Sequence, residues 1–178
     1  MSGEEIAAKE KKRNVVISII LLGIMLLSTA GFAFIYNFDS AKSVQGGKVQ
    51  SYGDRWAVDI GGNTVTFTIS PDEALNGTTM GFISNLNQFY NMPLYVDTDN
   101  DAVYSEIGSS LGLYAARVQH GCYSDCSDSE WPEKDCTNNL IVFRENVSKS
   151  ITQNQSCVFI DGDMGSVDAF LYKTLGLA

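Results

Sequence analysis

The hydrophobic residues of this chain form one long block near the amino terminus and then many short groups that alternate with polar residues. The block covers residues 15–36, VVISIILLGIMLLSTAGFAFIY, and carries no charge. As a helix that rises about 1.5 Å per residue, it would span roughly 33 Å, which is enough to cross the hydrocarbon core of a bilayer. The pattern therefore predicts a transmembrane helix over residues 15–36.

Basic residues precede this block and indicate its orientation. They are Lys9, Lys11, Lys12 and Arg13. Under the positive-inside rule, residues 1–14 form a cytoplasmic tail and the chain beyond residue 36 lies outside the membrane. We therefore expect a single-pass protein of the cell membrane, whose partner through residues 15–36 is the lipid bilayer.

The alternative to an anchor is a signal peptide that is cleaved after export. Small residues at Ser28 and Ala30 suit a signal peptidase and follow an apolar core. The apolar block continues through residues 31–36, which is longer than a signal core requires, and this favours a retained anchor. With either reading, the rest of the chain is exported.

The chain beyond the block divides into a linker and one domain. Residues 37–54 are polar and contain paired glycines, which is typical of a spacer, and residues 55–178 have the length of one ordinary domain. From residue 38 onward the chain has eight Lys and Arg against eighteen Asp and Glu, a net charge of −10. Nucleic acid is therefore excluded as a partner, since phosphate binding requires a basic surface.

The domain begins with the clearest strand pattern in the chain. Apolar and polar residues alternate over 56–60 and again over 65–69, with two glycines and an asparagine between the two groups. This pattern predicts a β-hairpin with one buried face. Ser70 and Pro71 follow, and they predict a helix that begins there, with Ser70 as its cap.

Helical and strand patterns then alternate. Apolar residues at helical spacing predict a helix over 79–91, and the apolar run 93–96 predicts a strand. A helix over 100–111 and a strand over 113–119 follow. Strand, helix and strand make a βαβ unit, so these two strands should be parallel.

The carboxyl-terminal part continues the mixture. Residues 140–143, 150–152 and 157–160 are short groups typical of strands, and a last helix begins near residue 165 with Asp168 complementing its positive amino end. Together these elements predict an α/β (or α+β) domain whose mixed β-sheet is flanked by about three helices.

Four cysteines lie in the exported part, an even number that predicts two disulfides in an oxidising compartment. Of the three pairings, we prefer Cys122–Cys126 with Cys136–Cys157. The first would close a polar loop on itself, and the second would tie the end of that loop to a core strand. Zinc binding and a redox pair are alternative uses of the thiols, but no two cysteines have the two-residue spacing typical of either.

Asp97, Asp99 and Asp101 have the opening spacing of a calcium-binding loop. Ala102 stands where that loop requires glycine, and Gly108 stands where it requires a bidentate glutamate. The three aspartates are therefore weak candidates for a cation site at the end of a strand. A strand end followed by the cap of a helix is the favoured interpretation.

The sequence contains no recognisable catalytic or cofactor motif. It has no phosphate-binding glycine loop, no haem-attachment motif and no zinc-protease motif, and its single histidine, His120, is expected in an exposed loop. We therefore assign no catalytic residue and no cofactor. Three Asn-X-Ser/Thr sequons in the exported part are acceptors for glycosylation, at Asn76, Asn146 and Asn154.

The order of features resembles that of small single-pass archaeal membrane proteins of unknown function. The shared features are an anchor, a hairpin before a helix start, a strand and helix, a Cys-x-Asn before a strand, a Cys-apolar strand and a terminal helix. Beyond the anchor they lie at residues 69–72, 94–97, 102–111, 136–138, 140–143, 155–160 and 168–177. The resemblance implies an archaeal cell surface and a Cys136–Cys157 disulfide, and it implies no activity.

We expect a membrane-anchored extracytoplasmic domain with a non-catalytic role, as a binding or structural component of the cell envelope that docks to another envelope or membrane protein. One alternative is an exported enzyme, or a protein that binds a small ligand or cation, using the strand ends near residues 97–101 and 119–122. A pocket there with converging carboxylates and a bound ion would favour this alternative, whereas a convex, closed surface with an apolar patch would favour the binding domain. A second alternative is a thiol redox protein, which would require an exposed reactive cysteine.

Overall fold

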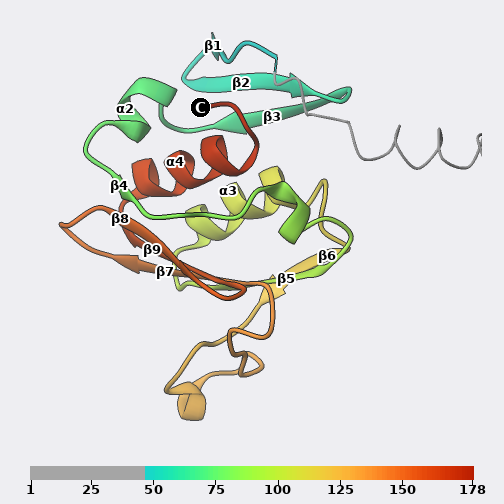
Figure 1. Cartoon of the computed structure of the whole chain (residues 1–178), viewed down its shortest axis with the longest axis vertical. Helices are drawn as coiled ribbons and strands as arrows, with labels where there is room; N and C mark the ends of the chain where they lie inside the picture. Colours follow the sequence, from blue (N-terminus) through green and yellow to red (C-terminus); the bar gives the residue numbers. More distant parts are fainter. Residues whose placement is uncertain (1–46) are drawn as a thin grey trace, which may run out of the picture. The chain divides into compact units, whose positions relative to one another are not determined.

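The structure is a computed structural model that describes residues 47–178. In this part of the chain, two β-sheets enclose a layer of helices (Figure 1). Three antiparallel strands form one sheet in the order β1-β2-β3, and six strands form the other in the order β4-β8-β9-β7-β5-β6. The described residues thus form an α/β domain with a mixed sheet and three α-helices, as the sequence predicts.

The elements follow one another along the chain. They are β1 (Gln50–Tyr52), β2 (Arg55–Ile60), β3 (Asn63–Phe67), α2 (Pro71–Leu75), β4 (Thr79–Met80), the 3₁₀ turn η1 (Leu86–Gln88), β5 (Pro93–Asp97), α3 (Asp101–Leu111), β6 (Arg117–His120), the 3₁₀ turn η2 (Cys126–Asp128), β7 (Leu140–Glu145), β8 (Ser150–Asn154), β9 (Cys157–Gly162) and α4 (Met164–Thr174).

β2 and β3 form the hairpin that the alternating pattern predicts, with Val58 opposite Val65. Gly61 and Gly62 make the turn at φ values of 60° and 87°, which glycine adopts without steric cost. Val58, Val65 and Phe67 are buried in the core between the two sheets. The hairpin is therefore fixed both by its turn and by its apolar face.

Two features of the hairpin differ from the expectation. Gln50–Tyr52, placed in the linker by their polar character, form β1 and pair with β2. The hairpin also belongs to a sheet of its own instead of the mixed sheet, because its buried face covers the helices from the opposite side. The order of strands in space is a tertiary property that local patterns do not contain.

The six-stranded sheet contains the βαβ unit that the sequence predicts. β5 and β6 are parallel and are joined through α3, and β7 is parallel to both β5 and β9. β8 is antiparallel to β9, and β4 adds a short parallel pair at the edge. Because three adjacent parallel strands β5, β7 and β9 end at the same edge of the sheet, their carboxyl ends lie side by side.

The core lies between the sheets and is centred on α4. Phe170 and Leu171 have no exposed surface, and the Tyr172 ring packs against that of Phe67 with centroids 4.2 Å apart. The opposite face of the six-stranded sheet carries a smaller apolar cluster that includes Tyr95 and Leu140. The loop between β6 and β7, residues 121–139, projects from that side (Figure 1) and is called the cysteine loop below.

The helix predicted over residues 79–91 is wrong. Residues 79–80 form β4, and only η1 is helical within the predicted range. Hydrogen bonds to β8 take precedence, since the Gly81 amide donates to the Ile151 carbonyl at 2.9 Å and the Ser84 amide donates to the side-chain Oε1 of Gln153 at 2.6 Å. The helical spacing of the apolar residues gave a wrong prediction because these residues do not share one buried face. Phe82 is 87% exposed, whereas Phe89 is fully buried.

The role expected for Asp168 is also wrong. The amino end of α4 is capped by Asp163, whose side chain accepts a hydrogen bond from the Ser166 amide at 3.3 Å. Asp168 is completely buried one turn further on, and its Oδ2 accepts a hydrogen bond from the Ile69 amide at 2.7 Å. Because α4 lies between two sheets, most of its residues are buried, and Asp168 is one of them.

Within residues 47–178, every helix is too short or too polar to cross a bilayer. The predicted transmembrane helix, residues 15–36, lies outside the described residues, as do the predicted cytoplasmic tail and most of the linker.

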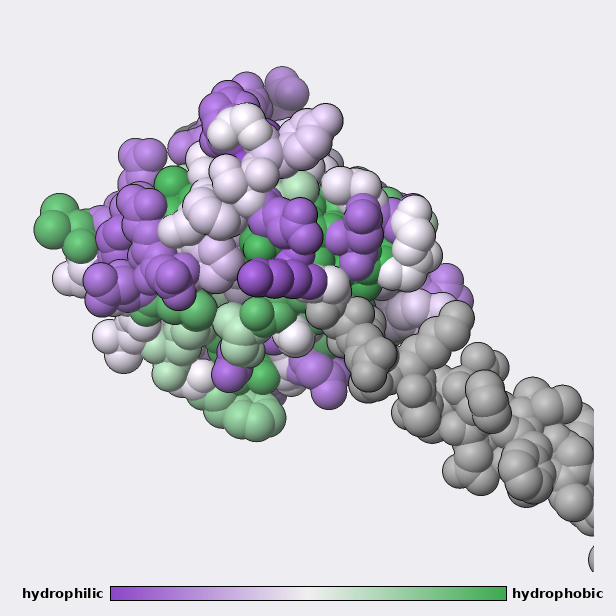
Figure 2. Space-filling model, turned by 90° about the horizontal axis from the view of Figure 1, so that it is seen from above, coloured by the Kyte–Doolittle hydropathy of each residue, from purple (hydrophilic) through white to green (hydrophobic). Residues whose placement is uncertain are grey.

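On the face of the domain that Figure 2 shows, polar residues surround small groups of apolar ones. This mixture is ordinary for protein surface in contact with water. The apolar residues of that face therefore do not by themselves indicate a binding surface.

Candidate functional site

A cleft opens at the carboxyl ends of β5 and β7, with a volume of about 1060 Å³. The amino end of α3 forms one side and the cysteine loop forms the other. We call it the strand-end cleft. It is lined by Asp97, Thr98, Asp99, Asn100, Asp101, Ala102, Cys122, Ser124, Asp125, Ser129, Glu130, Trp131, Phe143, Arg144 and Glu145.

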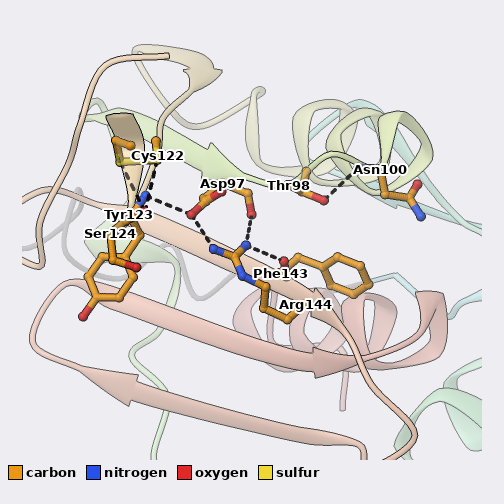
Figure 3. Close-up of polar contacts among 9 residues, drawn as sticks. Asp97, Thr98, Asn100, Cys122, Tyr123, Ser124, Phe143 and Arg144 are labelled. Carbon is orange, nitrogen blue, oxygen red and sulfur yellow. Dashed lines mark hydrogen bonds and ion pairs between the residues drawn. A yellow bond between two sulfur atoms is a disulfide. The ribbon is translucent and has the colours of Figure 1, made fainter. Parts of the chain in front are cut away.

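An ion pair joins the two strands in the cleft. Arg144, at the end of β7, donates from Nη2 to Oδ2 of Asp97, at the end of β5, at 2.8 Å (Figure 3). The same Asp97 oxygen accepts the backbone amide of Tyr123 at 2.9 Å. Asp97 is 7% exposed, so its charge is satisfied by a cation and an amide instead of by water. It thereby holds β7 and the cysteine loop to β5.

The side of the cleft at α3 is set by a helix cap. Asn100 Oδ1 accepts the backbone amides of Ala102 and Val103, at 3.0 and 3.2 Å, and Thr98 Oγ1 accepts the amide of Asn100 at 3.1 Å. These bonds satisfy amides that a helix leaves free at its start. The predicted strand end and helix cap at residues 97–101 are both present. The cap leaves Asp99 and Asp101 exposed beside the cleft.

A stack of three aromatic rings supports the other side. His120, at the end of β6, lies between the rings of Tyr104 and Trp131, with centroid distances of 3.8 and 4.3 Å. Trp131 belongs to the cysteine loop and lines the cleft. The expectation of an exposed loop histidine is wrong: His120 ends a strand and is partly buried, because the loop folds back over it. The stack fixes the position of the Trp131 ring.

Both predicted disulfides are present in the preferred pairing. Cys122–Cys126 closes a short turn in the cysteine loop, and Cys136–Cys157 ties the end of that loop to β9. Lys134 adds a third attachment, with its Nζ 4.5 Å from the centre of the Tyr95 ring on β5. Because these attachments lie on both sides of Trp131, the wall of the cleft is anchored at two ends.

Charge in the strand-end cleft is strongly unbalanced. Six of its fifteen lining residues are Asp or Glu, and one is Arg. The three aspartates singled out from the sequence, Asp97, Asp99 and Asp101, all line this cleft. Across residues 47–178, however, no three His, Cys, Asp or Glu side chains are grouped so that they could hold a metal ion.

Several cleft residues were not found from the sequence. Arg144 lies near the end of β7, directly after a buried apolar run, and this position is the local signal that marks it. That β7 pairs with β5 is a tertiary relation that the sequence pattern does not contain. Trp131, Asp125 and Glu130 come from a polar loop whose fold depends on the disulfides. Nothing in their spacing indicates that they lie across a cleft from α3.

The three sequon asparagines lie apart from one another on the surface. Asn76 follows α2, Asn146 follows β7 and Asn154 ends β8, and all three are exposed. Of these, Asn146 is adjacent in sequence to the cleft residue Glu145.

The chain matches no protein-family model, and neither the curated proteins nor the solved structures contain a significant match to it.

Proposed function

We propose that this protein is a membrane-anchored, extracytoplasmic binding domain that receives a Lys- or Arg-bearing segment of another envelope protein in the strand-end cleft. Its role is non-catalytic. Residues 15–36 anchor it in the membrane, and residues 1–14 stay in the cytoplasm.

The observation that carries this proposal is the combination of charge and aromatic surface in the cleft. Arg144, the one cation among the described lining residues, is already paired with Asp97. The other five acidic residues are exposed, and none of them forms an ion pair within residues 47–178, so they attract cations. Trp131, held by its aromatic stack, offers a face over which an ammonium or guanidinium group is attracted by the ring quadrupole. Carboxylates beside such a ring suit lysine and arginine side chains.

The volume of the cleft leaves room for a peptide segment. At about 1060 Å³ it is at the upper end of the volumes typical of small-molecule pockets. Polar rims of this kind also speed association, because complementary charge steers a partner toward the site.

A small cationic ligand is the second candidate, because the cleft lies where open α/β sheets bind ligands, at the carboxyl ends of parallel strands. The two candidates differ in one property. A peptide would contact the cleft over several residues, so its affinity would grow with the number of its basic residues. For a small cationic ligand, a single amine would bind as tightly as a peptide with several basic residues.

The test is a calorimetric titration of the full-length chain, in detergent micelles, with a synthetic lysine-rich peptide. A cleft variant carries Asp99→Asn, Asp101→Asn and Glu130→Gln together. The matched control carries Asp54→Asn, Asp59→Asn and Glu73→Gln, which change the net charge equally on exposed positions of the β1–β3 layer and α2. We expect the cleft variant to lose at least about tenfold in affinity and the control less than about twofold. Equal losses in the two variants would show attraction to overall charge only.

A further inference from the structure

Two carboxyl groups, those of Glu106 and Asp168, lie within hydrogen-bonding reach of each other in the core of the domain, away from the cleft. Glu106 lies on α3 and Asp168 on α4. These two helices belong to the layer enclosed by the two sheets. Glu106 is 4% exposed, and Asp168 has no exposed surface. Acidic residues are almost never buried to this extent unless they are paired. The described residues supply a single cation to this pair, Arg55 at the start of β2, which donates from Nη2 to Glu106 Oε2 at 2.5 Å.

Each carboxyl group has one oxygen with a donor and one without. Glu106 Oε2 is bound by Arg55, and Asp168 Oδ2 accepts the Ile69 amide. Glu106 Oε1 and Asp168 Oδ1 are buried and have no donor among the described residues. An ionised carboxylate only accepts hydrogen bonds. If both groups were ionised, both of these oxygens would stay buried without a donor, and their lost hydration would destabilise the folded state.

One proton satisfies both oxygens. With a hydrogen on either carboxyl group, its O–H donates to the other, and the pair carries one negative charge against the one positive charge of Arg55. We propose that Glu106 and Asp168 share a single proton in the folded protein, and that this proton is a pH-sensitive latch that holds the β1–β3 sheet onto the helical layer.

The position of the pair explains why the latch acts on that sheet. Arg55 begins β2, and the Ile69 amide bound by Asp168 follows the end of β3. Tyr172, also on α4, donates its hydroxyl to the Ile69 carbonyl at 2.8 Å. The pair therefore contacts the hairpin at its open end, where β2 begins and β3 ends, from the helices beneath it. Loss of the proton places two adjacent negative charges at this junction with one cation to balance them.

The groups that face the pair act in both directions, and burial is the largest influence. Burial raises the pKa of Asp168 to about 7, opposed by the hydrogen bonds from the Ile69 and Thr68 amides and supported by the charge of Glu106. Burial, Asp168 and Glu106 also raise the pKa of Tyr172, so this hydroxyl stays protonated at ordinary pH.

The sign of the effect follows from this direction. The pKa of Asp168 is higher in the folded protein than its ordinary value of 3.8, so the folded state binds more protons than the unfolded state between these values. Stability is fully present below about pH 4 and is lost as the pH rises through about 7. The latch thus closes in mild acid and loosens in mild alkali.

Asp168→Asn tests the latch, because asparagine reproduces the protonated form at every pH. Its Oδ1 accepts the Ile69 amide and its Nδ2 donates to Glu106 Oε1. The measurement is urea unfolding of the full-length chain in micelles from pH 5 to 8. A Trp131→Phe background leaves Trp56, next to Arg55, as the only tryptophan. Asp59→Asn is the matched control, since Asp59 is exposed on the same sheet and asparagine retains an acceptor for Thr64.

In the background chain and the Asp59→Asn control, we expect the unfolding equilibrium constant to rise by up to about tenfold per pH unit from pH 5 to 7. In Asp168→Asn it should rise less than about twofold per unit, with stability at pH 8 at least equal to that of the background chain. Glu106→Gln places an amide donor on the other member of the pair, so it should show the same weak pH dependence. It replaces Asp168→Asn in the test if that variant fails to fold. Unchanged pH dependence in the amide variant that folds would overturn the shared proton, as would failure of both variants to fold.

Discussion

Asp97 and Arg144 lie at the ends of neighbouring parallel strands, and their ion pair, with Oδ2 and Nη2 2.8 Å apart, forms part of the strand-end cleft. Arg144 also donates to its neighbour's carbonyl, Phe143 O, at 2.8 Å. The pair has a structural task, since it joins two strands and one loop. Because Arg144 is paired with Asp97, it does not neutralise the other acidic residues of the cleft, which are available to bind a cationic partner.

We expect Arg144→Ala to lower the free energy of unfolding by about 1–2 kcal/mol, because it leaves the buried Asp97 carboxylate with one donor fewer. Half of the Arg144 side chain is exposed, which keeps the loss below that of a fully buried pair. Urea unfolding of the full-length chain measures the change. Arg144→Lys should lose less, because it keeps the charge. Wild-type stability in Arg144→Ala would show that the pair contributes nothing.

The two disulfides should differ in their contribution to stability. Cys136–Cys157 closes a loop with a sequence separation of 21, and Cys122–Cys126 one with a separation of 4. From loop-closure entropy we expect replacement of the first pair by alanine to cost about 3 kcal/mol and of the second about 2 kcal/mol. The first also unties the cysteine loop from β9. Denaturant unfolding of the two double variants decides the order, and a greater loss from the Cys122–Cys126 variant would contradict it.

The cap of α3 gives a third prediction. Asn100→Ala removes the acceptor for two backbone amides, so it should cost about 1 kcal/mol. Asn100→Asp should cost little, because aspartate is an equally good cap. Thermal unfolding followed by circular dichroism distinguishes the two variants. Equal stability of the alanine and aspartate variants would mean that the cap is not needed to form α3.

In acid, the ion pair of Lys149 with Asp163 should govern part of the stability. The hydrogen bond from Lys149, with its charge, lowers the pKa of the Asp163 carboxyl group below its ordinary value of 3.8. A lowered folded pKa contributes stability that is present above the unfolded pKa and is lost as the pH falls through the folded one. More than half of the Asp163 side chain is exposed, so Lys149→Met should remove only about 0.5 kcal/mol at pH 5, and less below pH 3. A loss that grows as the pH falls would contradict this assignment.

Local patterns predicted the parts of the fold whose causes are local. The hairpin at Gly61 and Gly62, the cap at Ser70 and the βαβ unit around α3 each depend on residues close in sequence. Both disulfides were also predicted. The helix expected over 79–91 failed because the backbone of that segment pairs with β8, a contact far along the chain.

The cleft was predicted in part. Residues 97–101 were recognised as a strand end and helix start, and the structure places them at the cleft. Arg144 and Trp131 were missed because each reaches the site through a tertiary arrangement, Arg144 through strand order and Trp131 through the stack with His120. The Glu106–Asp168 pair was missed for the same reason, since its members come from helices that meet only in the folded core.

The central claim, that the strand-end cleft is the binding surface, is tested most directly by the two tryptophans. The chain has only Trp56 and Trp131, so ¹H–¹⁵N spectra of the full-length protein contain two indole signals, one from the cleft and one from β2. On titration with the lysine-rich peptide, we predict that the Trp131 signal shifts with the backbone signals of residues 99–102 while the Trp56 signal stays in place. A shift of Trp56 without Trp131, or equal shifts of both, would place binding elsewhere and contradict the account.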